Sequence, residues 1–132
     1  MTAEEATFRA FVVPKKRERY AELLQTKRGR EKIRLSLDHF KDLDPTFCRR
    51  IESAKQFVPD ILRTLKALGA PSVCHVISSN SSLDGLEMDL AEALGEIVGL
   101  GCGSFVCCVP GKLAYFEGEE MQERYICHRH RG

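Results

Sequence analysis

Residues 73–78 read VCHVIS, residues 89–101 read DLAEALGEIVGLG and residues 104–117 read SFVCCVPGKLAYFE. The first and last stretches are rich in β-branched and aromatic residues, which favour strands. The middle stretch has apolar residues at helical spacing, an aspartate placed to cap its start, and glycines at its end. The order strand, helix, strand, turn, strand predicts a sheet with a helix packed on it.

The connections suggest how these strands pair. Pro110-Gly111 suits a tight turn, so residues 104–109 and 112–117 should form an antiparallel hairpin. Two strands joined by a helix are usually parallel, which would make residues 72–78 parallel to residues 104–109. Residues 124–128 are expected to form a fourth strand. The hairpin is apolar on both alternate sets, which predicts that helices cover both faces or that one face meets another protomer.

The N-terminal half has apolar residues at helical spacing over about residues 15–68. Asp44-Pro45 is typical of a helix start, and Gly29 is expected to lie between two helices or at a kink. The predicted fold class is therefore α+β, with these helices packed on a small mixed sheet of three or four strands in the order β-α-β-β(-β). We expect a single domain, 1–132, with residues 1–7 and 129–132 frayed.

Charge is distributed unevenly along the chain. Residues 9–34 hold ten basic and three acidic residues, a net charge of +7, whereas residues 81–120 have a net charge of −7. The basic segment is a candidate surface for nucleic acid or a protein partner. Its candidate residues are Lys15, Lys16, Arg17, Arg19, Lys27, Arg28 and Arg30. The competing interpretations are a solvated helix face, or neutralisation by the acidic half of the chain or of a second copy.

The loop from Ser79 to Glu87 follows the first strand of this half, and it is the one loop with grouped polar groups. Asp84 and Glu87, with Glu117 from a strand end, are candidate carboxylates for a hard cation or for acid–base chemistry. His75 is a candidate general base because histidine titrates near neutral pH. Ordinary turn chemistry and an interior histidine explain the same residues, so we assign none of the four a catalytic role.

The six cysteines do not have the spacing of a metal site. There is no Cys-x-x-Cys pair, and adjacent Cys107 and Cys108 point to opposite faces of a strand. We therefore predict no metal and no cofactor, and interpret Cys127 to Arg131 as a polar terminus. No apolar run is long enough for a membrane span and no secretory leader is evident, so we expect a cytoplasmic protein with reduced thiols.

No phosphate-binding, nucleophile-elbow or metalloprotease motif occurs. The sequence therefore favours a non-catalytic protein-interaction or regulatory module, expected to be a homodimer because of its charge asymmetry and two-sided apolar hairpin. Nucleic-acid binding through the basic segment is the first alternative. A small metal-dependent hydrolase using Asp84, Glu87 and Glu117 is the second.

Overall fold

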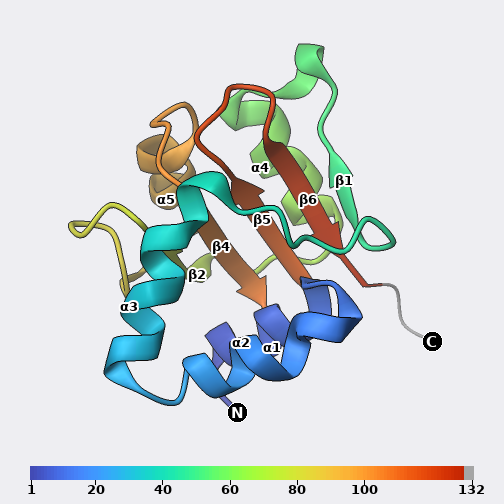
Figure 1. Ribbon diagram of the computed structural model, residues 1–132. Coiled ribbons are helices and arrows are strands. Elements are labelled where there is room, and N and C mark those ends of the chain that lie inside the picture. The colour runs from blue at the N-terminus through green and yellow to red at the C-terminus, as the bar shows by residue number, and fades with distance from the viewer. Residues whose placement is uncertain (130–132) are drawn as a thin grey trace.

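The computed structural model describes residues 1–129, which form an α+β fold around one antiparallel sheet (Figure 1). The strands are β1 (Cys48–Arg50), β2 (Val73–Ser78), β3 (Glu87–Asp89), β4 (Ser104–Val109), β5 (Leu113–Glu117) and β6 (Arg124–His128). The helices are α1 (Ala3–Phe11), α2 (Arg17–Leu23), α3 (Lys27–Ser36), α4 (Val58–Ala67) and α5 (Leu90–Ile97). Short 3-10 turns occupy Pro14–Lys16, Leu37–His39 and Ser53–Lys55.

The sheet differs from the predicted mixed sheet of three or four strands. It has six strands in the order β1-β6-β5-β4-β2-β3, and every neighbouring pair is antiparallel. The predicted parallel pairing of β2 with β4 is wrong, because the chain reverses after β2 and returns as β3 at the outer edge. Helix α5 then starts from the end of β3, so its crossover joins β3 to β4, with β2 between them. Strand β3 was not predicted, because its sequence, Glu-Met-Asp, is short and polar.

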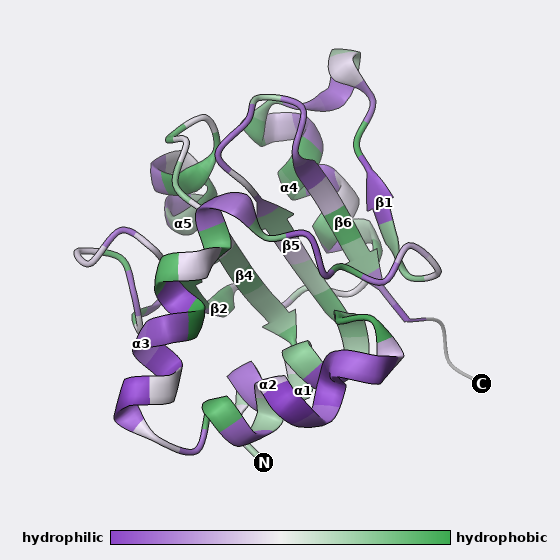
Figure 2. Ribbon diagram, in the orientation of Figure 1, coloured by the Kyte–Doolittle hydropathy of each residue, from purple (hydrophilic) through white to green (hydrophobic). Residues whose placement is uncertain are grey.

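Helices cover both faces of the sheet. On one face α1, α2 and α3 pack a cluster that contains Phe8, Phe11, Ile33, Phe105 and Phe116. On the other face α4 and α5 pack a second cluster, built around Ile61, Leu65, Leu94, Val106 and Tyr115. The hydropathy colouring shows the apolar strands β4 and β5 between these layers (Figure 2). The hairpin is therefore apolar on both sides because its own chain covers both.

Two local predictions about the N-terminal half are corrected. The first residues are not frayed, because Thr2 caps α1 by accepting a hydrogen bond from the Glu5 N–H, and Phe8 and Phe11 are fully buried. Asp44-Pro45 does not start a helix. The Asp44 carboxylate instead accepts from Thr46 N–H, and the chain continues into β1, which pairs with β6. Residues 129–132 were expected to fray at the other end. Residues 130–132 lie outside the described residues, whereas Arg129 donates from Nε to the carbonyl of Ala10.

Other local predictions are confirmed. Pro59 lies in the first turn of α4, Asp89 caps α5 by accepting from Glu92 N–H, and Gly111 has the positive φ of 74° that the hairpin turn needs. Gly29, expected between two helices or at a kink, instead lies inside the first turn of α3, and the break between α2 and α3 spans residues 24–26. None of the helices in residues 1–129 is long and apolar enough to cross a membrane.

Candidate functional site

Arg30 of α3 lies between two carboxylates that come from distant parts of the chain. Its Nε and Nη2 donate to Glu4 at 2.9 and 2.7 Å, and its Nη1 and Nη2 donate to Asp84 at 2.7 and 3.1 Å. His75 Nε2 lies 2.7 Å from the same Glu4 carboxylate. This network joins α1, α3, β2 and the β2–β3 loop, so Arg30 and His75 hold elements of the fold together.

Glu4 is the centre of this network, and sequence reasoning missed it. Burial by itself raises the pKa of Glu4, but hydrogen bonds from His75 and Arg30 outweigh burial and lower the pKa to about 2. Hydrogen bonds to Glu4 and Asp84 raise the pKa of Arg30. The ion pair between Arg30 and Glu4 is therefore intact at neutral pH. No sequence signal marked Glu4, because its partners lie 26 and 71 residues away.

Asp84 has a structural role in the loop that was the main candidate for a site. Its Oδ1 accepts from the N–H of Ser78 at 3.0 Å, and its Oδ2 is 3.8 Å from Arg34 Nε. Arg34 also donates to the carbonyl of Ser79 at 2.7 Å. The acidic loop is thus fastened onto the basic helix α3. These contacts agree with the interpretation that the acidic half of the chain neutralises charges of the basic segment.

Glu117 is buried on the opposite face of the sheet from Asp84. It accepts hydrogen bonds from the backbone N–H groups of Gly99 at 3.0 Å and Gly101 at 3.4 Å, and from the Tyr115 hydroxyl at 2.7 Å. Burial, together with the nearby carboxylate, raises the pKa of Tyr115. The carboxylate therefore fixes the loop between α5 and β4, whose glycines were predicted to end that helix.

The three candidate carboxylates do not converge. Glu87 is exposed on edge strand β3, while Asp84 and Glu117 are engaged on opposite faces. Within residues 1–129, no three His, Cys, Asp or Glu side chains lie close enough to share a metal ion. Among the cysteines, burial raises the pKa of Cys74 to about 11 and that of Cys107 to about 12, which disfavours a nucleophilic thiolate at either.

Several of the basic residues predicted to bind a partner have partners within the chain. Lys16 Nζ is 3.0 Å from Asp42, and Arg17 Nη2 donates to Asp44 at 2.9 Å. Like Arg30, these residues fasten the N-terminal helices to the rest of the fold. In the described part of the chain, the remaining candidates have neither a hydrogen bond nor an ion pair from their side chains; they are Lys15, Arg19, Lys27 and Arg28.

A surface concavity of about 980 Å³ lies where α2 turns into α3. Three of its lining side chains are the cations Lys27, Arg28 and Lys32, none of which makes a hydrogen bond or ion pair with another described residue. Two others, Leu23 and Leu35, are apolar. The other lining residues are Thr26, Gly29 and Glu31. We call these eight residues the α2–α3 surface. Lys32 was counted in the basic segment, but only the helix turn places it beside Lys27, Arg28 and Leu35.

Gly29 lets the two helices meet closely at this surface. A Cβ built at Gly29 would lie 2.1 Å from the carbonyl oxygen of Leu23, so only glycine fits without moving the backbone. Thr26 caps α3 by accepting from Gly29 N–H at 2.9 Å. The shape of the α2–α3 surface is therefore set by a tight corner whose backbone is well fixed.

Comparisons with known proteins give no further guide, since no family model, no curated protein and no solved structure matches the chain.

Proposed function

We propose that this protein is a non-catalytic interaction module that binds an acidic segment of a partner protein on the α2–α3 surface. The observation that carries this proposal is the combination of three cations without partners and two leucines around one concavity. Elsewhere on the N-terminal helices, cations such as Lys16, Arg17 and Arg30 are bound by carboxylates of the same chain.

Charge supports an anionic ligand. Lys27, Arg28 and Lys32 lie within two turns of one helix, while the only acidic lining residue, Glu31, is hydrogen bonded to Arg34. Neighbouring like charges repel each other, and a ligand with carboxylates relieves that repulsion. The positive potential of the surface also attracts such a ligand during the encounter. The attraction is exposed to solvent and should weaken as salt is added.

The leucines favour a peptide over a nucleic acid. Leu35 is 59% exposed, and a partner's apolar side chain placed on it would remove apolar surface from water. None of the eight lining residues is aromatic, whereas sequence-tolerant binding of single strands relies on aromatic side chains that stack on bases. An acidic segment with an apolar anchor matches both features of the surface.

Fluorescence anisotropy with labelled probes tests the proposal. The first probe is a peptide of about twelve residues, mostly glutamate with two leucines; the second has glutamine in place of glutamate. We expect binding of the acidic probe only, weaker at high salt. The charge-reversed variant K27E/R28E/K32E should weaken binding by about tenfold or more. The matched control R49E/K66E/K112E changes the same net charge at exposed residues outside the surface and should bind as the wild type does.

Three outcomes would overturn the proposal. Equal binding of the acidic and glutamine peptides would remove the electrostatic argument, and equal weakening by both charge-reversed variants would remove the assigned surface. Random single-stranded and duplex oligonucleotides are measured beside the peptides. If they bind more tightly than the acidic probe and K27E/R28E/K32E abolishes that binding, the anionic partner is a nucleic acid and the protein-partner proposal is replaced.

A further inference from the structure

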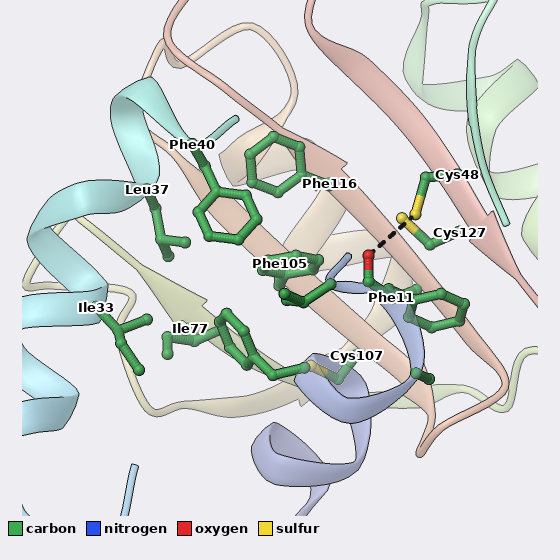
Figure 3. Packing of buried hydrophobic residues seen from close by; sticks show 14 residues of the cluster. Phe11, Ile33, Leu37, Phe40, Cys48, Ile77, Phe105, Cys107, Phe116 and Cys127 are labelled. Atoms are coloured by element: carbon green, nitrogen blue, oxygen red, sulfur yellow. Dashed lines mark hydrogen bonds between the residues drawn. The ribbon is translucent and has the colours of Figure 1, made fainter. Parts of the chain in front are cut away.

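Cys48 and Cys127 lie directly opposite each other on the neighbouring strands β1 and β6. The backbone bonds on either side, from His128 N–H to the Phe47 carbonyl and from Ile51 N–H to the Arg124 carbonyl, make this a non-hydrogen-bonded pair. Figure 3 shows the two sulfur atoms side by side in the core next to Phe11, whose carbonyl oxygen accepts a hydrogen bond from the Cys48 thiol at 3.7 Å. In such pairs the two backbones approach most closely, within the Cα separation that a disulfide spans.

We infer that Cys48 and Cys127 are a site of oxidative modification, at which a cross-strand disulfide joins β1 to β6. Both residues are reduced in the described structure, and both are buried. The next cysteine in the same row is Cys107, but Ala114 of β5 lies between it and Cys127. Two strand spacings separate those thiols, too far for a bond.

The structure gives a small oxidant a route to Cys48. This residue lines a surface cavity of about 460 Å³, together with Val13, Phe40, Leu43, Pro45 and Tyr125. Its strand, β1, has three residues and lies at the edge of the sheet. Short edge strands open locally at low cost compared with the core. Cys127 is fully buried, so Cys48 is the thiol that reacts first.

The chemistry is thiol–disulfide exchange with a low-molecular-weight disulfide such as oxidised glutathione. The Cys48 thiolate attacks one sulfur of the oxidant, and one glutathione thiolate leaves. The Cys127 thiolate then attacks the Cys48 sulfur of the mixed disulfide, and the second glutathione leaves. The protein loses two hydrogen atoms and the oxidant gains two. Burial disfavours the thiolate of Cys127, so the exchange is slow while β1 stays paired.

The bond would fasten the edge strand to the sheet and would close a loop of about 80 residues. Closing a long loop restricts the unfolded chain, so the oxidised form should resist unfolding better than the reduced form. The segment before β1 forms an isolated antiparallel bridge from Leu43 to Val12, the residue that follows α1, so the bond would also hold that segment in place. Oxidation would therefore hold β1 against β6 at one edge of the sheet, and reduction would remove this constraint.

The test uses the full chain carrying C102S, because Cys102 is the one described cysteine that is not buried and would otherwise form mixed disulfides. The protein is incubated with oxidised glutathione below its melting temperature. We expect a mass loss of about 2 Da, a Cys48–Cys127 linkage in non-reduced peptide mapping, and a rise in Tm of about 5–15 °C that dithiothreitol reverses. Adding C48A or C127A should abolish the mass loss, whereas adding C74A should not.

Three results would overturn this inference. These are a linkage between Cys74 and Cys108, products that carry glutathione without an internal bond, or no change in mass after prolonged incubation. The C48A variant removes the thiol without introducing a buried hydroxyl group, and its fold is checked by circular dichroism. If C48A fails to fold, Cys48 is blocked reversibly with a small methylthiolating reagent that enters through the cavity it lines, and the same mapping decides between the outcomes.

Discussion

At the scale of single residues, the charged side chains that looked functional in the sequence mostly hold the structure together. Asp84, His75 and Arg30 belong to one network with Glu4, and Glu117 binds the backbone of the α5–β4 loop. Carboxylates in such positions are costly to bury but are stabilised by several donors each. Removing these carboxylates should therefore lower the free energy of unfolding rather than abolish a catalytic activity.

Glu4→Gln should destabilise the protein by about 1–3 kcal/mol at pH 7, because charge-assisted hydrogen bonds to Arg30 and His75 are weakened. The pKa of Glu4 falls from 4.5 to about 2 on folding, so its contribution is complete above pH 4.5 and is lost as the pH falls towards 2. Urea denaturation of wild type and variant between pH 7 and pH 2.5 measures the difference. It should stay constant down to about pH 5 and shrink below that.

Glu96→Gln is the matched control for this measurement, because Glu96 is exposed on α5. Its effect should stay within about 0.5 kcal/mol. A difference between wild type and Glu4→Gln that is as large at pH 2.5 as at pH 7 would show that the charge of Glu4 is not the stabilising feature.

Glu117→Gln should loosen the loop between α5 and β4. The amide group of glutamine has one oxygen and a donor group, so it leaves a buried N–H of Gly99 or Gly101, or the Tyr115 hydroxyl, without an acceptor. We expect a loss of about 1–3 kcal/mol and faster hydrogen exchange at the Gly99 and Gly101 amides. Glu120→Gln, at an exposed residue, should leave both amides unchanged. Equal exchange rates in the two variants would contradict this role for Glu117.

At the scale of elements, the helices follow local signals, and the edge strands do not. Asp89 caps α5, and Pro59 opens α4, as their sequences indicate. Strands β1 and β3 have three residues each and carry charged side chains, so neither has the length or alternation that predicts a strand. They exist because β6 and β2 offer unpaired backbone groups beside them.

Two glycine substitutions in helices should have effects of opposite sign. Gly29→Ala places a Cβ 2.1 Å from the Leu23 carbonyl oxygen, so the α2–α3 corner must open, at a cost of about 1–3 kcal/mol. Gly95→Ala in α5 meets nothing within 4 Å and should stabilise the protein by about 0.5–1 kcal/mol, because alanine loses less backbone entropy in a helix. Chemical denaturation measures both. Stabilisation by Gly29→Ala would contradict the close approach of α2 and α3.

At the scale of the whole molecule, α1 is an integral part of the core. Phe8 is fully buried, and its ring lies 5.6 Å from that of Tyr20, 6.1 Å from that of Phe40 and 5.2 Å from that of Phe105. It therefore joins α1, α2, the segment after α3, and β4. The same organisation places the acidic β2–β3 loop against the basic helix α3, where Asp84 pairs with Arg30 and Arg34.

Phe8→Ala should cost about 3–5 kcal/mol, because it leaves a cavity at the meeting point of four segments. Phe57→Ala removes the same side chain from a position that is 64% exposed and should cost less than about 1 kcal/mol. Thermal unfolding followed by circular dichroism compares the two variants. A small effect of Phe8→Ala would mean that α1 is not packed as described and would revive the expectation of a frayed N-terminus.

The sequence by itself determined the α+β class, the helices α4 and α5, and the β4–β5 hairpin, because caps, turn residues and side-chain periodicity act over a few residues. Only the tertiary structure decided that β2 pairs antiparallel with β4, that Glu4 meets Arg30, and that Lys27, Arg28, Lys32 and Leu35 share one concavity. These features depend on contacts between residues far apart in the chain or on the turn of a helix in space. A local sequence pattern does not show which distant residue a charged side chain contacts or which strand pairs with the edge of a sheet.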